Sequence, residues 1–196
     1  MAIATLSAQT MTLPHENWTI HDIGDESDYK DFLEEFFEEH GWTVIREEAP
    51  AGTGYSADML IEDDELGWFG IEAKVTNYGG SQPAAAHHQI VNKYRGRMYI
   101  GHRIDRWIYA PFYEYAADAE DSTDIPDPQR QHIVTELMCS FFNRHGIGYL
   151  DPFRWDITFR YLEPEYTISI QEDTPQTAIA AIDAHVDKRM QEYSYR

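Results

Sequence analysis

The sequence predicts a mixed α/β fold in which helices cover a central sheet. Apolar residues recur at helical spacing in four segments, and short runs of β-branched and aromatic residues lie between them. The predicted order is helix, three strands, helix, strand, helix, strand, hairpin and helix, which is typical of layered sheets. At 196 residues the chain has the length of one domain. We divide it into an N-terminal arm (1–25), a core (26–151) and a C-terminal hairpin and helix extension (152–196).

The first predicted helix begins near Asp28, with Ser27 as its N-cap, and ends at Gly41. Its apolar residues share one face and predict a buried stripe of Tyr29, Phe32, Leu33, Phe36 and Phe37. Strands are predicted at 42–48, 58–62 and 68–76. The third alternates strictly, so one face carries Phe69, Ile71, Ala73 and Val75, and the other carries Trp68, Gly70, Glu72, Lys74 and Thr76.

The second half repeats this alternation of helices and strands. We expect one helix over 84–99 that turns Ile90, Val91, Tyr94 and Met98 toward the core, then a strand at 106–113. A helix at 129–146 with a glycine stop and a short strand at 147–151 follow. Residues 155–171 predict a hairpin that turns at 163–165, and 174–193 predict a helix capped by Thr174.

The charge is strongly negative, because 35 acidic residues face 15 basic ones and give −20. The acids are spread along the chain, so we interpret them as the solvated coat of a salt-adapted, halophilic archaeal protein. The alternative is a surface that repels or mimics nucleic acid. In molar salt the Debye length is roughly 3 Å, so such a protein can still approach DNA. We find no signal-peptide pattern and no membrane-spanning apolar run, and therefore expect a cytoplasmic protein without a membrane partner.

Three charged residues of the second and third predicted strands point to a chemistry. Glu72 and Lys74 leave the same face of one strand, and Asp58 opens the strand before it. Carboxylates are the hard ligands that Mg²⁺ or Mn²⁺ prefers, and such a metal polarises a phosphate and lowers the pKa of bound water. A lysine beside it can orient or deprotonate that water, or neutralise developing charge. The plain alternative is a solvated Glu72–Lys74 salt bridge worth less than about 1 kcal/mol.

This pattern resembles the PD-(D/E)XK nuclease superfamily, whose signature is an Asp at the start of one strand and Glu-x-Lys on the next. Here "SAD" supplies Asp58 and "IEAK" supplies Glu72 and Lys74, although Ala57 stands where the family usually has Pro. The layout from Asp28 to about residue 151 is similar to archaeal Holliday-junction resolvases. The resemblance implies a restriction-endonuclease-like mixed sheet flanked by helices, a metal-dependent deoxyribonuclease activity, DNA as partner and, by analogy, a homodimer.

The resemblance also implies roles for single residues. Asp58 and Glu72 would ligate Mg²⁺ or Mn²⁺, with the backbone carbonyl of Ala73 as a further ligand, and Lys74 would act on the attacking water. A carboxylate of the first helix could complete the site; the candidates are Asp31 and Glu35.

The predicted helix after the third strand adds polar candidates. Gln89 followed by Tyr94 resembles the extra motif of RecB-type exonucleases, in which the glutamine would hydrogen-bond the scissile phosphate or a metal-bound water. The densest basic cluster follows, and its nucleic-acid-binding candidates are Lys93, Tyr94, Arg95 and Arg97, with Arg103 and Arg106 nearby. The alternative is an amphipathic helix that keeps Tyr94 in the core, with arginines that pair with acids.

Two other functions remain open on the sequence. The chain could be a nuclease-fold module that binds nucleic acid or protein without cleaving it. It could also be an acidic interaction protein of a halophile or its virus, in which Glu72 and Lys74 form only a surface pair.

Overall fold

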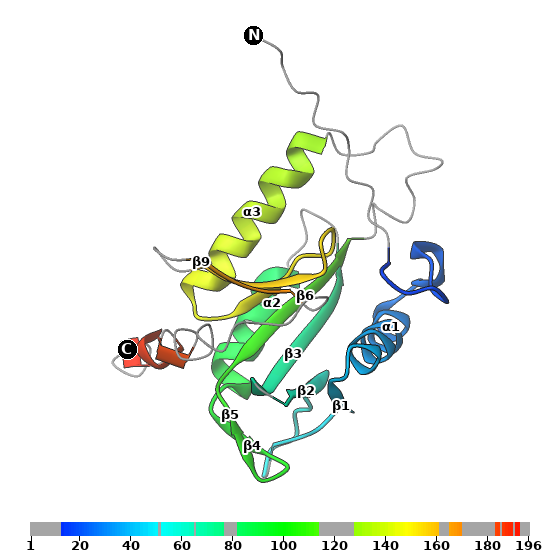
Figure 1. Ribbon diagram of the computed structural model, residues 1–196. Coiled ribbons are helices and arrows are strands. Elements are labelled where there is room, and N and C mark those ends of the chain that lie inside the picture. The colour runs from blue at the N-terminus through cyan, green and yellow to red at the C-terminus, as the bar shows by residue number, and fades with distance from the viewer. Residues whose placement is uncertain are drawn as a thin grey trace.

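The computed structural model describes residues 13–50, 52–64, 66–76, 82–113, 128–160, 165–169, 183–184, 186–189 and 191–192. Its centre is a seven-stranded mixed sheet with the strand order β1-β2-β3-β6-β7-β8-β9, and helices lie on both of its faces (Figure 1). The predicted mixed α/β architecture is therefore confirmed at this level. Within the described residues, no helix combines the length and the apolar character needed to cross a membrane.

Helix α1 (Glu26–Glu39) covers one face of the sheet and buries the whole predicted aromatic stripe. Its N-cap is Asp25, whose carboxylate accepts hydrogen bonds from the backbone N–H groups of Ser27 and Asp28. The prediction of Ser27 as the cap is therefore wrong, because the helix begins two residues earlier than the apolar pattern indicated. Gly41, with φ of +84°, ends the helix as expected.

Strands β1 (Thr43–Arg46), β2 (Met59–Asp63) and β3 (Gly67–Thr76) form an antiparallel meander. β3 then pairs in parallel with β6 (Trp107–Tyr113), which pairs in parallel with β7 (Gly148–Leu150). The predicted alternation of β3 is confirmed: its odd-numbered residues join the core under α1, whereas Trp68 packs against the core of the other face. With helices on both sides, even the polar residues Glu72 and Lys74 are buried.

The predicted helix over 84–99 is shorter than expected. α2 (Gln82–Gln89) continues into a π-helical turn, η2 (Ile90–Tyr94), and the chain then turns at Gly96, where φ is +73°. It continues as a two-stranded hairpin of β4 (Arg97–Tyr99) and β5 (His102–Ile104). The expected core position of Met98 is wrong, since this residue is exposed on β4.

The remaining elements extend and cover the sheet. α3 (Pro128–Arg144) packs with α2 over the face opposite α1, and Gly146 with φ of +68° follows it. β8 (Asp156–Arg160) and β9 (Glu165–Ser169) form the predicted hairpin and join the same sheet. The described parts of the C-terminal segment, 183–184, 186–189 and 191–192, are helical. The predicted cap Thr174 and most of the hairpin turn lie outside the described residues.

The N-terminal segment leads into α1 through a short 3-10 helix, η1 (Ile20–Asp22). Trp18 and Ile20 pack against the core under α1, so this part of the N-terminal arm is docked on the body. The indole N–H of Trp18 donates to a carboxylate oxygen of Glu35 at 2.8 Å, which fixes this segment to α1.

Candidate active site

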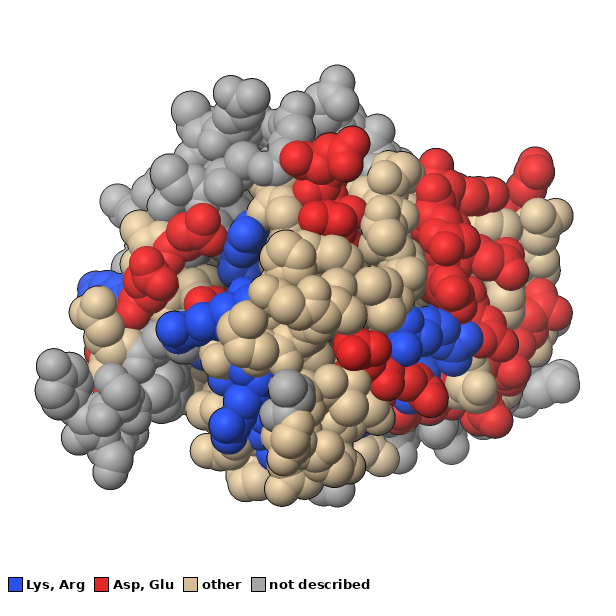
Figure 2. Space-filling view, turned by 90° about the horizontal axis from the view of Figure 1, so that it is seen from below, with Lys and Arg blue, Asp and Glu red and all other residues tan. Residues whose placement is uncertain are grey.

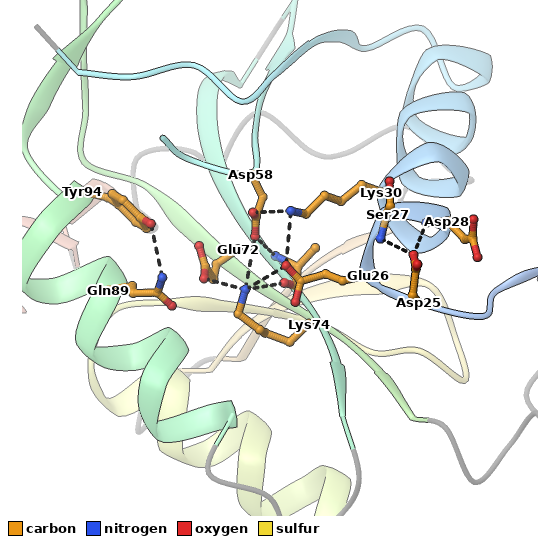
Figure 3. Close-up of polar contacts among 11 residues, drawn as sticks. Asp25, Glu26, Ser27, Asp28, Lys30, Asp58, Glu72, Lys74, Gln89 and Tyr94 are labelled. Carbon is orange, nitrogen blue, oxygen red and sulfur yellow. Dashed lines mark hydrogen bonds and ion pairs between the residues drawn. The ribbon is translucent and has the colours of Figure 1, made fainter. Parts of the chain in front are cut away.

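Asp58, Glu72 and Lys74 lie together on the α2 side of the sheet, next to the start of β2 (Figure 3). Lys74 Nζ is 2.9 Å from Glu72 Oε1 and 3.5 Å from Asp58 Oδ2. The structure thus brings the three charged residues of the motif into direct contact. Because Glu72 is 1% exposed, the pair it forms with Lys74 is not a solvated surface salt bridge.

Asp58 is held in place by the backbone of β3. β2 begins only at Met59, which pairs with Ile71, so β3 extends past the end of the β2–β3 ladder. Ala73 therefore has no partner residue in β2 and faces a gap beside that end. The carboxylate of Asp58 fills this gap, and its Oδ2 accepts a hydrogen bond from the backbone N–H of Ala73 at 2.9 Å. The carbonyl of Ala73 accepts from Lys74 Nζ at 2.9 Å. The oxygens of all three expected ligands, Asp58, Glu72 and Ala73, therefore contact this one ammonium group.

Helix α1 contributes two further charged residues that the sequence analysis missed, Glu26 and Lys30. Lys30 Nζ is 2.7 Å from Asp58 Oδ1 and 3.2 Å from Glu26 Oε1. Glu26 Oε1 is also 3.3 Å from Lys74 Nζ. Glu26 and Lys30 are one helical turn apart, so both point to the same side of α1. This i, i+4 spacing is the sequence signal that could have identified the pair.

The helix carboxylates expected from the sequence lie elsewhere. Asp31 and Glu34 form ion pairs with Arg46 of β1. Glu35 accepts from the Trp18 indole and lies 3.5 Å from His15 Nε2. The expectation that Asp31 or Glu35 completes the site is therefore wrong, because α1 turns a different part of its polar face toward β3.

The charges of this cluster do not balance. Three carboxylates (Glu26, Asp58 and Glu72) and two ammonium groups (Lys30 and Lys74) leave a formal charge of −1 when all are ionised. Burial, followed by repulsion from Asp58, raises the pKa of Glu72 to about 7, although Lys74 opposes this rise. Burial disfavours the charged form of Lys74, but Glu72 and Asp58 outweigh it and raise its pKa, so Lys74 is an ammonium at neutral pH.

Glu72 is buried without adequate hydrogen bonding. Lys74 Nζ is close to Oε1, but neither carboxylate oxygen accepts a well-directed hydrogen bond from any residue that the structure describes. A buried carboxylate in this situation is costly unless a cation compensates it. A second cation, or a proton, at Glu72 would therefore stabilise the site beyond what Lys74 supplies.

The donor types fit a hard divalent cation: Asp58, Glu72 and the Ala73 carbonyl are all oxygen ligands. Among the described residues, however, no three His, Cys, Asp or Glu side chains are arranged as a ready-made metal site. Lys30 and Lys74 lie between the carboxylates and satisfy them in part. A divalent ion bound there would take over the neutralising role of these two ammonium groups.

Gln89 and Tyr94 lie on the other side of Glu72 from α1 in Figure 3. Gln89 Nε2 donates to the Tyr94 hydroxyl over 3.4 Å. Burial raises the pKa of Tyr94 to about 12, and the charges of Glu72 and Asp58 add to this rise. The ring of Tyr94 stacks on Trp107 with centroids 5.2 Å apart and is nearly buried, so it belongs to the core, as the alternative interpretation expected.

The expected basic cluster is divided in the structure. Arg95 turns inward, donates to the backbone carbonyls of His145 and Gly146 at 2.9 Å each, and has its pKa lowered to about 10 by burial. This position does not suit the expected contact with nucleic acid. Lys93 lies over the ring of Tyr55 at 5.0 Å, and Arg97 is exposed on β4.

Charge is unevenly distributed over the surface seen in Figure 2. Acidic residues gather on the side where α1 lies, and most of the basic residues in this view lie on the opposite half, toward β4 and β5. The chain has no significant match to any protein-family model, curated protein or solved structure. Its function must therefore be inferred from the residues of the site.

Proposed function

We propose that the protein is a divalent-metal-dependent nuclease that hydrolyses phosphodiester bonds in DNA. The observation that carries this proposal is the buried, under-bonded carboxylate of Glu72 beside Asp58 and Lys74. A carboxylate pair with an adjacent lysine on one sheet face is also the feature that resembles the PD-(D/E)XK superfamily. A simple structural ion pair would not require a second carboxylate on the same ammonium group.

Asp58, Glu72 and the carbonyl of Ala73 would hold Mg²⁺ or Mn²⁺. When bound, such an ion supplies a Lewis acid for the phosphate and a water of lowered pKa. Asp58 is already oriented for this role, because the Ala73 N–H fixes one of its oxygens. The third carboxylate, Glu26, lies within the same cluster and would position a water or a second ion.

Lys74 would act as a cation toward the substrate. Its pKa is raised, so it holds its proton at neutral pH and cannot accept one from water in the metal-free state. An ammonium in this position would orient the attacking water through its N–H groups and offset the negative charge that develops on the phosphoryl oxygens. Gln89, on the same side of the sheet, would donate its amide N–H to a phosphate oxygen.

The first test is DNA cleavage by purified protein in MgCl₂ or MnCl₂, at low and at high KCl, with linear, circular and branched DNA as substrates. We expect wild-type protein to cut at least one of these forms and Lys74→Met to lose at least about 100-fold in rate, since a positioned charge of this kind is worth several kcal/mol. Lys188→Met is the matched control, because Lys188 is an exposed lysine in the C-terminal segment. Equal rates for wild type and Lys74→Met would contradict the proposal.

A module that binds DNA without cleaving it is the second candidate. It is favoured by Lys30, which lies 2.7 Å from Asp58 Oδ1 and supplies charge that a metal would otherwise provide. Isothermal titration with MnCl₂ separates the two candidates. A nuclease should bind Mn²⁺ in a manner that Asp58→Asn abolishes, whereas a metal-independent module should show no heat that depends on Asp58.

A further inference from the structure

The hairpin of β4 and β5 carries a charge opposite to that of the molecule as a whole. Segment 93–106, which includes the hairpin, contains five of the 15 basic residues of the chain, and Asp105 is its single acidic residue. Arg97 and Arg103 belong to the strands of the hairpin, whereas Arg95 turns inward. Figure 1 shows the hairpin as a projection at the lower edge of the sheet. A locally basic projection on a protein of charge −20 indicates a polyanionic partner.

The base of the hairpin is firmly anchored. Tyr99 and Ile104 are fully buried and pack in the core that contains Trp107. His102, which pairs with Tyr99 across the two strands, stacks on Trp68 of β3 with ring centroids 5.6 Å apart. A two-stranded hairpin alone is marginally stable, so these contacts give it a fixed position relative to β3.

The opposite face of the hairpin is open to solvent. Met98 and Arg103 lie directly across from each other, and their side chains share this outer face. Met98 is 48% exposed, Ile100 at the turn is 42% exposed, and the Arg103 side chain is 58% exposed. Arg103 pairs with Asp105 at 3.0 Å, an exposed ion pair that a phosphate can replace at little cost.

The turn itself is strained. Ile100 and Gly101 have φ of +42° and +87°, which makes this a two-residue turn with both central residues left-handed. Asn or Gly normally occupies the first position, and a β-branched residue there is an outlier. The chain therefore places an exposed apolar side chain at a position where Asn or Gly would adopt the turn conformation at lower energetic cost. An exposed apolar side chain in an unfavourable backbone conformation is a candidate for a role in binding.

We propose that the exposed surface of this hairpin, formed by Arg97, Met98, Ile100 and Arg103, is a DNA-contacting element. Ile100 and Met98 would pack against bases or sugars, as apolar side chains do when they enter a groove. Arg97 and Arg103 would contact phosphates on either side. The proposal rests on the proposed nuclease function and names a part of the substrate surface.

The position of the hairpin relative to the candidate site suits this role. His102 of the hairpin stacks on Trp68 of β3. Trp68 and Glu72 lie on the same face of β3 and are four residues apart, or roughly 13 Å along the strand. DNA that contacts the hairpin could therefore place a phosphate a few nucleotides away at Glu72 and Lys74.

The test is fluorescence anisotropy with a labelled duplex that has splayed single-stranded arms, and with the fully paired duplex of the same sequence. All proteins carry Lys74→Met, so that DNA stays intact in MgCl₂. We expect Ile100→Asn to weaken binding roughly fivefold, through loss of one half-exposed apolar side chain, while its melting temperature stays equal or rises. Arg97→Gln with Arg103→Gln should lower the slope of log Kd against log salt concentration by about two, one for each lost phosphate contact.

The matched controls are Leu137→Asn, an exposed apolar residue of α3, and Arg154→Gln, an exposed arginine before β8. Both should bind DNA with the same affinity and salt slope as the Lys74→Met protein without further substitutions. If Ile100→Asn lowers the melting temperature, Met98→Gln on the neighbouring strand replaces it as the apolar test. If wild-type protein cleaves DNA but the hairpin variants have the same affinity and salt slope as the Lys74→Met protein, the hairpin proposal alone is overturned. Wild-type protein that neither binds nor cleaves DNA would overturn the proposed function with it.

Discussion

Glu72 is the residue at which burial and charge oppose each other most directly. Its folded-state pKa of about 7 lies above its ordinary value of 4.5, because burial and Asp58 disfavour the carboxylate. A raised pKa means that the fold favours the protonated form. The stability contributed by protonated Glu72 is therefore fully present below pH 4.5 and is lost as pH rises through about 7.

Glu72→Gln should remove this pH dependence in the metal-free protein. Above pH 8 we expect the variant to be more stable than wild type by up to roughly 3 kcal/mol, since a tenfold change in proton affinity between the folded and unfolded states corresponds to about 1.4 kcal/mol. Near pH 4.5 the two proteins should be alike. Urea denaturation in EDTA across this range measures the difference, and Glu38→Gln on the exposed face of α1 is the control. Parallel stability curves for wild type and Glu72→Gln would contradict a raised pKa at Glu72.

At the scale of elements, the N-terminus of α1 connects helix capping to the site. Asp25 caps the helix, and Glu26, its first residue, contacts both Lys30 and Lys74. Fraying of this turn would therefore withdraw a carboxylate from the charged cluster. The cap and the cluster should respond together to a change at Asp25.

Asp25→Ala should lower the free energy of unfolding by about 1 kcal/mol, because two backbone N–H groups lose their acceptor. Asp25→Asn should retain most of this stability, since an Asn side chain accepts the same hydrogen bonds. Chemical denaturation of the two variants beside wild type measures both effects. An asparagine variant as unstable as the alanine variant would show that charge, rather than hydrogen bonding, is responsible.

Local patterns predicted most elements, and the misses have a physical cause. The stripe of α1 and the alternation of β3 are periodic over enough residues to determine both element type and buried face. The β4–β5 hairpin was missed because Tyr94 and Met98 continue a helical spacing and the turn has Ile100 where Asn would have marked it. Gly96 was the one local signal of the break.

The candidate site was predictable only in part, for a related reason. Glu72 and Lys74 belong to β3, and Asp58 directly precedes the paired strand β2, so strand pairing brings them together. Glu26 and Lys30 reach the site through the packing of α1 on the sheet, and sequence periodicity does not specify which part of a polar helix face lies over a strand end. The inward turn of Arg95 toward Gly146 likewise depends on α3, which is distant in sequence.

For the whole molecule, charge is the dominant feature. A net charge of −20 with acids gathered on the α1 side creates repulsion that folding must overcome. Salt screens this repulsion, and the Debye length falls from about 10 Å at 0.1 M to about 3 Å at 1 M. The salt-adapted interpretation of the sequence depends on this effect.

We expect the melting temperature to rise by several degrees between these two KCl concentrations. Differential scanning fluorimetry at constant pH measures the change, and urea titrations at both concentrations confirm it as a change in free energy. KCl is the appropriate salt, since sulfate would add a separate effect by being excluded from the protein surface. A flat or falling melting temperature would contradict adaptation to salt.

The order in which the ribosome makes this chain has a consequence for the charged cluster. Glu26, Lys30, Asp58, Glu72 and Lys74 all emerge before residue 77, whereas Tyr109, which lies beside Glu72 in the neighbouring parallel strand, follows more than thirty residues later. Because Glu72 gains this neighbour only once β6 has been made, its complete dehydration cannot precede the synthesis of β6. The charged partners of Glu72 are all synthesised before that point.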